Sequence, residues 1–244
     1  MKFPDPLIRG RLVKRYKRFL TDVELDDGTI VVAHCANSGS MLSVNTAGAE
    51  VWISPARNPD RKLRYTWEII RINRTLVGIN TAHPNAIAAD AVARGKIPEL
   101  TGYASVRREV KYGKNSRIDL LLERGGPDDG DKCYVEIKSV TMKRDLAKDA
   151  PVEFPDAVTT RGAKHLVELT DMVRQGHRAV MWYLVQRADS PAFTIAGDID
   201  PEYAKGLTKA MAAGVEVICY ACTVTRHGIT LSTPVPLAFP KKMA

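Results

Sequence analysis

The feature that most constrains the fold is an aspartate inside an otherwise apolar strand, followed at hairpin distance by a strand with two charged residues. Asp119 interrupts a run of apolar residues, and Glu136 and Lys138 lie in the next β-rich run, with 16 residues between Asp119 and Glu136. Glu136 and Lys138 are two residues apart, so their side chains face the same side of a strand. A turn at residues 125–131 would close a hairpin and bring two carboxylates and a lysine to one end of a sheet.

This arrangement predicts a divalent-metal site. Two close carboxylates repel each other, and their pKa values rise unless a cation lies between them. Mg²⁺ is usually bound by one or two carboxylates together with waters and substrate phosphate. We therefore expect Mg²⁺ (or Mn²⁺) on Asp119, Glu136 and the carbonyl of Ile137, and a catalytic set of Asp119, Glu136 and Lys138. Lys138 would orient the attacking water or balance developing charge. The alternative is a solvated Glu-x-Lys pair on a surface strand.

The order of the elements predicts two domains. The 244 residues are 45% hydrophobic, enough for a sizeable core. In residues 1–82, short β-rich segments predict an OB-like β-barrel. These segments are residues 20–25, 29–35, 50–54, 65–73 and 76–79. Residues 83–244 predict a mixed-sheet α/β domain, in which Asn85 would cap a helix that ends at Arg94. Its further elements are strands at 105–112, 117–123, 133–140, 178–186 and 215–225, and helices at 160–175 and 201–213.

Two resemblances add to this reading. Asp119 followed by Glu136-x-Lys138, on the order helix, three strands, helix, strand, resembles the PD-(D/E)xK nuclease superfamily. Ile118 precedes Asp119 where that superfamily often has proline, a departure that it tolerates.

Over nearly its whole length the chain also resembles the sugar fermentation stimulation protein family. The matching stretches are residues 10–19, 34–41, 108–113, 116–119, 135–140, 154–159 and 161–166. This resemblance implies an N-terminal OB-like domain, a C-terminal PD-(D/E)xK nuclease-like domain and DNA binding. The family name comes from an effect on sugar utilisation and defines no reaction.

The charge of the chain predicts a polyanionic partner. The formal net charge is +8, and residues 1–80 hold 13 Lys and Arg against 8 Asp and Glu. Six of the ten residues 9–18 are basic, and Phe19 follows them. Such a segment favours sequence-nonspecific DNA contacts, with RNA as an alternative, although a solvated strand face has the same pattern. The predicted nucleic-acid-binding residues are Arg11, Lys14, Arg15, Tyr16, Lys17, Arg18, Arg161 and Lys164. We predict no catalytic role for His165, which follows Lys164.

The composition excludes several classes of protein. The longest apolar run, Ala179 to Val185, has seven residues, whereas a membrane-spanning helix needs about 20. We see no secretory signal, and four scattered cysteines do not form a disulfide scaffold, so we expect a cytoplasmic protein. Cys219 and Cys222 form a CxxC motif without a second pair, and we expect buried thiols. Three functions remain: a metal-dependent DNA phosphodiesterase, a non-catalytic DNA-binding regulator of sugar metabolism on a nuclease fold, and an RNA-processing or RNA-binding module, since OB-folds also bind RNA.

Overall fold

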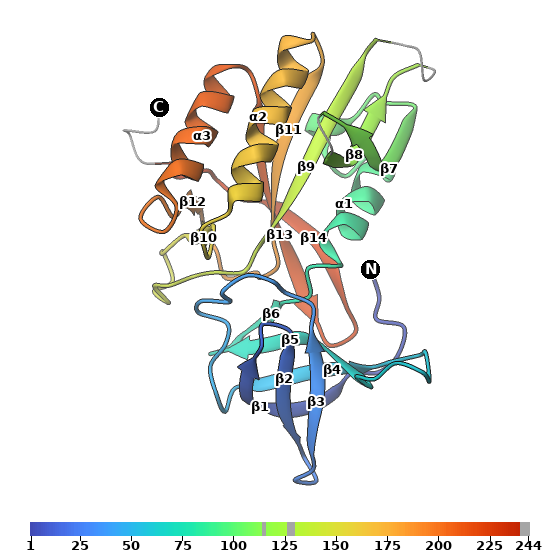
Figure 1. Ribbon diagram of the computed structural model, residues 1–244, viewed down its shortest axis with the longest axis vertical. Helices are drawn as coiled ribbons and strands as arrows, with labels where there is room; N and C mark the ends of the chain where they lie inside the picture. The colour runs from blue at the N-terminus through green and yellow to red at the C-terminus, as the bar shows by residue number, and fades with distance from the viewer. Residues whose placement is uncertain (114–115, 126–129, 240–244) are drawn as a thin grey trace.

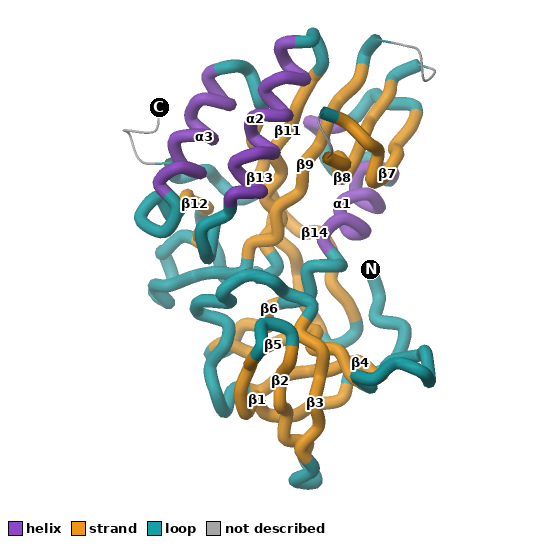
Figure 2. The backbone as a smooth tube through the Cα atoms, in the orientation of Figure 1, coloured by secondary structure: helices purple, strands orange, loops and turns teal. Residues whose placement is uncertain are grey.

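The N-terminal part of the chain folds into a closed β-barrel. The computed structural model describes residues 1–113, 116–125 and 130–239 (Figures 1 and 2). The strands of the first sheet are β1 (Ile8–Tyr16), β2 (Leu20–Leu25), β3 (Ile30–Cys35), β4 (Glu50–Pro55), β5 (Tyr65–Ile72) and β6 (Thr75–Gly78). Their order is β3-β2-β1-β4-β5-β6, and a parallel pairing of β3 with β5 closes the first five strands into a barrel. The predicted OB-like barrel is confirmed.

The barrel contains one strand that the sequence pattern does not reveal. β1 covers the basic segment, and its inward residues Gly10 and Leu12 are buried. A β-bulge between Leu12 and Lys14 breaks the alternation of inward and outward residues. The predicted segment at 76–79 is the appended strand β6 rather than a strand of the closed barrel.

The C-terminal part is a six-stranded mixed sheet with helices on both faces. Its elements are α1 (Pro84–Ala93), the short 3₁₀-helix Pro98–Leu100, β7 (Ser105–Tyr112), β8 (Ser116–Glu123), β9 (Lys132–Val140), β10 (Val152–Phe154), α2 (Thr160–Arg174), β11 (Arg178–Val185), β12 (Phe193–Ile195), α3 (Pro201–Ala212), β13 (Glu216–Thr225) and β14 (Gly228–Pro234). The order is β14-β13-β11-β9-β8-β7, in which β9, β11 and β13 are parallel. Helices α2 and α3 cover one face, and α1 covers the other (Figure 1). The predicted mixed-sheet α/β domain is therefore confirmed.

The start of α1 differs from the prediction. The N-cap is His83 and Pro84 takes the first helical position, so Asn85 does not cap the helix. Proline favours that position because its fixed φ suits a helix and it has no N–H to satisfy there. Asn85 is thereby released for a contact with Asp119. Strands β10, β12 and β14 were not predicted, and residues 126–129 of the predicted turn lie outside the described residues.

The barrel is joined to the sheet domain at several points. The Gly78 N–H at the end of β6 donates to the carbonyl of Gln186, at 2.9 Å. The amino group of Met1 donates to the carbonyl of Ile229 in β14, at 2.6 Å, so the N-terminal residues run beside that strand. Helix α1 begins six residues after β6 ends, which places its first turn at the junction. Within the described ranges, no helix is long and apolar enough to cross a membrane.

Candidate active site

Asp119 lies where the pairing of β8 with β9 ends. The two strands pair from Glu123 opposite Lys132 to Leu120 opposite Val135. Beyond that pair, the Oδ2 atom of Asp119 accepts the backbone N–H of Ile137, at 2.7 Å. A carboxylate therefore takes the hydrogen bond that a strand carbonyl would otherwise accept, and the two strands separate around it.

The environment of Asp119 disfavours its charged form. Its second oxygen, Oδ1, accepts a hydrogen bond from the Asn85 side chain, at 2.7 Å. Burial and then the negative charge of Glu136 raise the pKa of Asp119 from 3.8 to about 6, against the opposing effects of the Ile137 N–H, Lys138 and Asn85. Glu136 is thus close enough to repel Asp119, as the hairpin spacing predicts.

The two carboxylate oxygens of Glu136 differ in their contacts: one accepts hydrogen bonds, and the other has no partner within the described residues. Its Oε1 atom accepts hydrogen bonds from Lys138 Nζ, at 2.7 Å, and from His165 Nδ1. Its Oε2 atom is buried and has no hydrogen-bond partner within the described residues. Burial works to raise the pKa of Glu136, but the His165 hydrogen bond and the charge of Lys138 outweigh it, so the pKa lies below its ordinary value. A buried carboxylate oxygen without a donor is a natural cation ligand.

His165, for which we predict no catalytic role, lies in this cluster as a hydrogen-bond partner of Glu136. Arg161 Nε donates to His165 Nε2 at 3.4 Å, which places the imidazole proton on Nδ1 and directs it at Glu136. The side chain is 5% exposed. A sequence signal existed, because His165 lies on the buried face of α2 beside Leu166 and Leu169. A titratable residue on the apolar face of a helix needs a buried partner.

Both domains line the cleft around these residues, whose volume is about 400 Å³. The sheet domain contributes Asp119, Glu136, Ile137, Lys138, Arg161, His165 and the segment 154–159. The barrel contributes Asn37, Ser38 and Gly39 from the loop that follows β3. The barrel is therefore part of the wall of the candidate active site and not a separate appendage.

Two contacts hold the barrel loop against the sheet domain. Asp156 Oδ2 accepts the backbone N–H of Met41, at 2.8 Å, and the Ser40 hydroxyl donates to the Asp156 carbonyl. Gly39 lies so close to Asp156 that an added Cβ would be 2.6 Å from its Oδ2 atom. A larger residue here would displace the Asp156 carboxylate that accepts the Met41 N–H.

The residues present fit a hard divalent cation with few protein ligands. Within the described ranges, no group of three or more His, Cys, Asp and Glu side chains could hold a metal. Asp119 and Glu136 remain as carboxylate donors, with the open Oε2 of Glu136 and the predicted Ile137 carbonyl. Mg²⁺, Mn²⁺ or Ca²⁺ could complete such a shell with waters and phosphate oxygens, whereas a closed all-protein site could not be built here.

The predicted basic segment is largely occupied by internal contacts. Lys14 Nζ is 3.7 Å from Asp22, and Arg11 donates to the Gly48 carbonyl at 3.1 Å. Arg15 is a structural residue, since its guanidinium donates to the carbonyls of Arg18, Asn37, Gly39 and Ser40 at 2.8–3.2 Å.

The other predicted nucleic-acid-binding residues differ in position. Lys17 and Arg18 are exposed, and their side chains form no hydrogen bond or ion pair with the described residues. Tyr16 lies under Lys14, whose Nζ is 5.5 Å from the ring centre. Arg161 lines the cleft, whereas Lys164 turns to the Ser116 hydroxyl at 3.1 Å.

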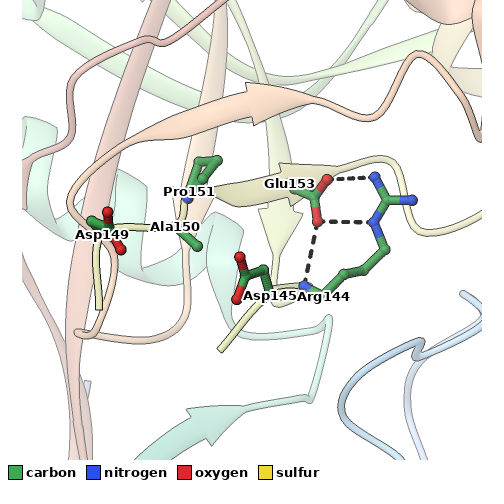
Figure 3. A pocket seen from close by; sticks show the side chains of 6 residues that line it. All are labelled: Arg144, Asp145, Asp149, Ala150, Pro151 and Glu153. Carbon is green, nitrogen blue, oxygen red and sulfur yellow. Dashed lines mark hydrogen bonds and ion pairs between the residues drawn. The ribbon is translucent and has the colours of Figure 1, made fainter. Parts of the chain in front are cut away.

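A second pocket, lined by Arg144, Asp145, Asp149 and Glu153, has no comparable chemistry (Figure 3). Arg144 is held by Glu153 and Asp198, so its cation is neutralised within the protein. No lysine or histidine is among the residues that line this pocket.

The CxxC motif forms neither a metal site nor a reactive thiol pair. Cys219 and Cys222 are buried and free, and they pack into the cores on opposite faces of the sheet. Burial raises the pKa of both thiols, that of Cys222 to about 12, so they are inert at neutral pH. The prediction of buried thiols is confirmed.

Comparisons with known proteins agree with this architecture. Residues 13–79 match the model of the SfsA N-terminal OB domain, and residues 82–228 match that of the sugar fermentation stimulation protein RE domain. A sugar fermentation stimulation protein homolog from Rhodospirillum rubrum is 62% identical over 98% of this chain and 100% of the relative. Another, from Paramagnetospirillum magneticum, is 57% identical over the full length of both chains.

The fold also has a solved counterpart. The structure of Pyrococcus furiosus SfsA in complex with Ca²⁺ superposes with a TM-score of 0.84 over 98% of each chain, at 24% sequence identity. At that identity the likeness concerns the fold alone. With both domain models matched in order and relatives identical at more than half of their positions, the chain belongs to the sugar fermentation stimulation protein family.

Proposed function

We propose that the chain is a divalent-metal-dependent phosphodiesterase that acts on DNA. The observation that carries the proposal is the convergence of Asp119, Glu136 and Lys138 in one cleft, with the Oε2 atom of Glu136 buried and unpartnered within the described residues. The Pyrococcus furiosus protein was solved in complex with Ca²⁺, which supports a divalent cation in the family.

Each residue of the cleft has a separate task in this proposal. Asp119, Glu136 and the Ile137 carbonyl would hold Mg²⁺ or Mn²⁺, which when bound polarises the phosphodiester and lowers the pKa of water. Lys138 Nζ, held 2.7 Å from Glu136 Oε1, stabilises charge that develops on the phosphate or orients the attacking water. Arg161 lines the cleft as a phosphate contact. His165 fixes the rotamer of Glu136 through its Nδ1–H.

A non-catalytic DNA-binding regulator of sugar metabolism is the second candidate. The small ligand set favours it, because Glu136 is already stabilised by the Lys138 cation and by the His165 hydrogen bond and can persist without a metal. The two candidates share DNA binding and differ in whether a bond is broken.

The test is to incubate the purified protein with labelled single- and double-stranded DNA and RNA in Mg²⁺, Mn²⁺ or EDTA. We expect cleavage that EDTA abolishes and that Glu136→Ala and Lys138→Ala remove. Glu202→Ala, an exposed change on α3, is the matched control and keeps full activity. Cleavage that persists in both site variants would identify a contaminant, and binding without cleavage would favour the regulator.

A further inference from the structure

The outer face of strands β1, β2 and β3 is divided into rows by the strand register. Residues directly opposite each other in antiparallel strands share a face. The row next to the β1–β2 turn consists of Tyr16, Leu20 and His34, and the row behind it consists of Lys14, Asp22 and Val32. Charge and aromatic character are therefore separated along this face.

In the rows away from the turn, Lys14 and Arg9 already form ion pairs with carboxylates of the protein. Lys14 lies 3.7 Å from Asp22, and Arg9 forms ion pairs with Asp26 at 3.1 Å and with Glu50 at 3.3 Å. A phosphate that bound there would have to compete with these carboxylates. This part of the face is poorly suited to a polyanion, although it carries much of the basic segment.

The turn end of the face is exposed, aromatic and basic. Phe19 is 43% exposed and is the sole aromatic side chain among the exposed large apolar residues of the described chain. Its ring stacks on His34, with 6.3 Å between the centroids and 29° between the planes. Lys17 and Arg18 form the adjoining turn with φ angles of 46° and 64°. Their exposed side chains have no polar partner within the described ranges.

This aromatic end adjoins the cleft of the candidate active site. Arg15 binds the Arg18 carbonyl at 2.9 Å on one side and the carbonyls of Asn37 and Gly39 on the other, at 2.8 and 3.0 Å. Asn37 and Gly39 line the cleft, and Asn37 follows His34 by three residues. A nucleic-acid strand that entered the cleft would thus pass Phe19 and His34 within a few nucleotides.

We propose that Phe19 and His34 form a stacking platform for an unpaired nucleobase, and that Lys17 and Arg18 bind the phosphates beside it. Aromatic rings stack any base, so the platform selects for exposed bases rather than for sequence. Bases inside a duplex are already stacked on their neighbours and cannot use it. The preferred ligand is then a nucleic acid with a single-stranded segment beside the cleft, an inference that rests on the proposed action on nucleic acid.

The test measures binding in EDTA, where the metal-dependent reaction cannot proceed. Fluorescence anisotropy would follow labelled oligothymidine, oligouridine, an abasic oligonucleotide of the same length and a blunt duplex. We expect Phe19→Ala and His34→Ala each to weaken oligothymidine binding by roughly five- to 150-fold, the range of one lost base stack. Binding of the abasic strand should not change. Val32→Ala, an exposed apolar change on the same face, is the matched control.

A spectroscopic variant gives a second readout. Trp52, Trp67 and Trp182 are buried, so a Phe19→Trp substitution would add a surface fluorophore. Its emission should be quenched by oligothymidine and unchanged by the abasic strand. An equal loss of affinity for both strands in Phe19→Ala, or an unquenched Phe19→Trp, would overturn the platform.

The outcomes separate this inference from the proposed function. Binding that depends on Phe19 without cleavage in any metal would overturn the phosphodiesterase and keep the platform. If the parent protein cleaves DNA and Phe19→Ala binds oligothymidine as tightly as the parent does, the platform is overturned and the phosphodiesterase is kept. Absence of binding to every strand would overturn both. Equal effects on oligothymidine and oligouridine would identify the base as the shared ligand of DNA and RNA.

Discussion

The Nδ1 atom of His165 lies 3.3 Å from the Nζ atom of Lys138, and both nitrogens donate to the same oxygen of Glu136. One carboxylate oxygen thus organises the lysine and the histidine, and the other has no hydrogen-bond partner in the part of the chain that the structure describes. This geometry makes His165 a positioning residue for Glu136 and Lys138.

We predict that His165→Ala lowers the rate of DNA cleavage by roughly 10- to 100-fold, the usual cost of removing a residue that orients a metal ligand. DNA affinity in EDTA should stay within about twofold, because His165 donates to Glu136 rather than to substrate. His165→Asn keeps an N–H donor near the Nδ1 position and should restore part of the rate. Val167→Ala, exposed on the same helix, is the control. Loss of affinity in parallel with rate would contradict a positioning role.

A second prediction concerns metal binding to the folded protein. Ca²⁺ or Mn²⁺ at about 100 times its Kd adds about 2.7 kcal/mol to the unfolding free energy. For a chain of this size this raises Tm by roughly 5–10 °C. Glu136→Gln removes the open Oε2 charge and should abolish most of the rise in thermal denaturation. Asp149→Asn, in the pocket beside Arg144, should leave it intact. If Glu136→Gln showed the same metal-dependent rise in Tm as the parent protein, the metal would bind elsewhere.

The convergence of Asp119, Glu136 and Lys138 could be predicted from the sequence because its determinants are local. Asp119 and Glu136 lie on consecutive strands, so the hairpin alone brings them together. The barrel could be predicted because most of its strands alternate, but β1 is obscured by its bulge after Leu12.

The remaining features depend on strand register or on long-range contacts. That Asp22 neutralises Lys14 follows from the pairing of β1 with β2, which no composition reveals. The contact of Asp156 with the Met41 N–H spans 115 residues. The density of basic residues at 9–18 therefore overstated the positive charge that a ligand meets.

The close approach of Gly39 to Asp156 predicts a coupled pair. A Cβ at position 39 would lie 2.6 Å from Asp156 Oδ2, so Gly39→Ala should lower the unfolding free energy by about 1–3 kcal/mol in urea denaturation. In an Asp156→Ala background the cost should fall by at least about 0.5 kcal/mol, because the clash is gone. Gly197→Ala is the control, since its Cβ would make an ordinary 3.5 Å contact with Ala204. Equal costs in both backgrounds would show that the two residues are independent.

Glu68 links the barrel to the candidate site and predicts a pH-dependent stability. It is 4% exposed and accepts hydrogen bonds from Ser54 at 2.7 Å and Asn80 at 2.8 Å, and His83 Nε2 lies 2.7 Å from it. His83 is the N-cap of α1, the helix whose Asn85 binds Asp119. Glu68 therefore fixes the start of that helix.

Burial works to raise the pKa of Glu68, but the hydrogen bond and charge of His83 and the hydrogen bonds of Ser54 and Asn80 outweigh it, so the pKa lies below its ordinary value. A lowered pKa means that the charged form stabilises the fold above the unfolded-state pKa of about 4.3, and that this stabilisation is lost as pH falls through the folded-state value. We expect Glu68→Gln to lower the unfolding free energy by about 2–4 kcal/mol at pH 7. The glutamine amide N–H would face groups that now donate to Glu68, and the buried charge would be lost. In urea denaturation the difference in unfolding free energy between Glu68→Gln and the parent protein should shrink below about pH 4. Glu202→Gln, which is exposed, should show no such trend, and a gap for Glu68→Gln that is independent of pH would contradict a charged Glu68.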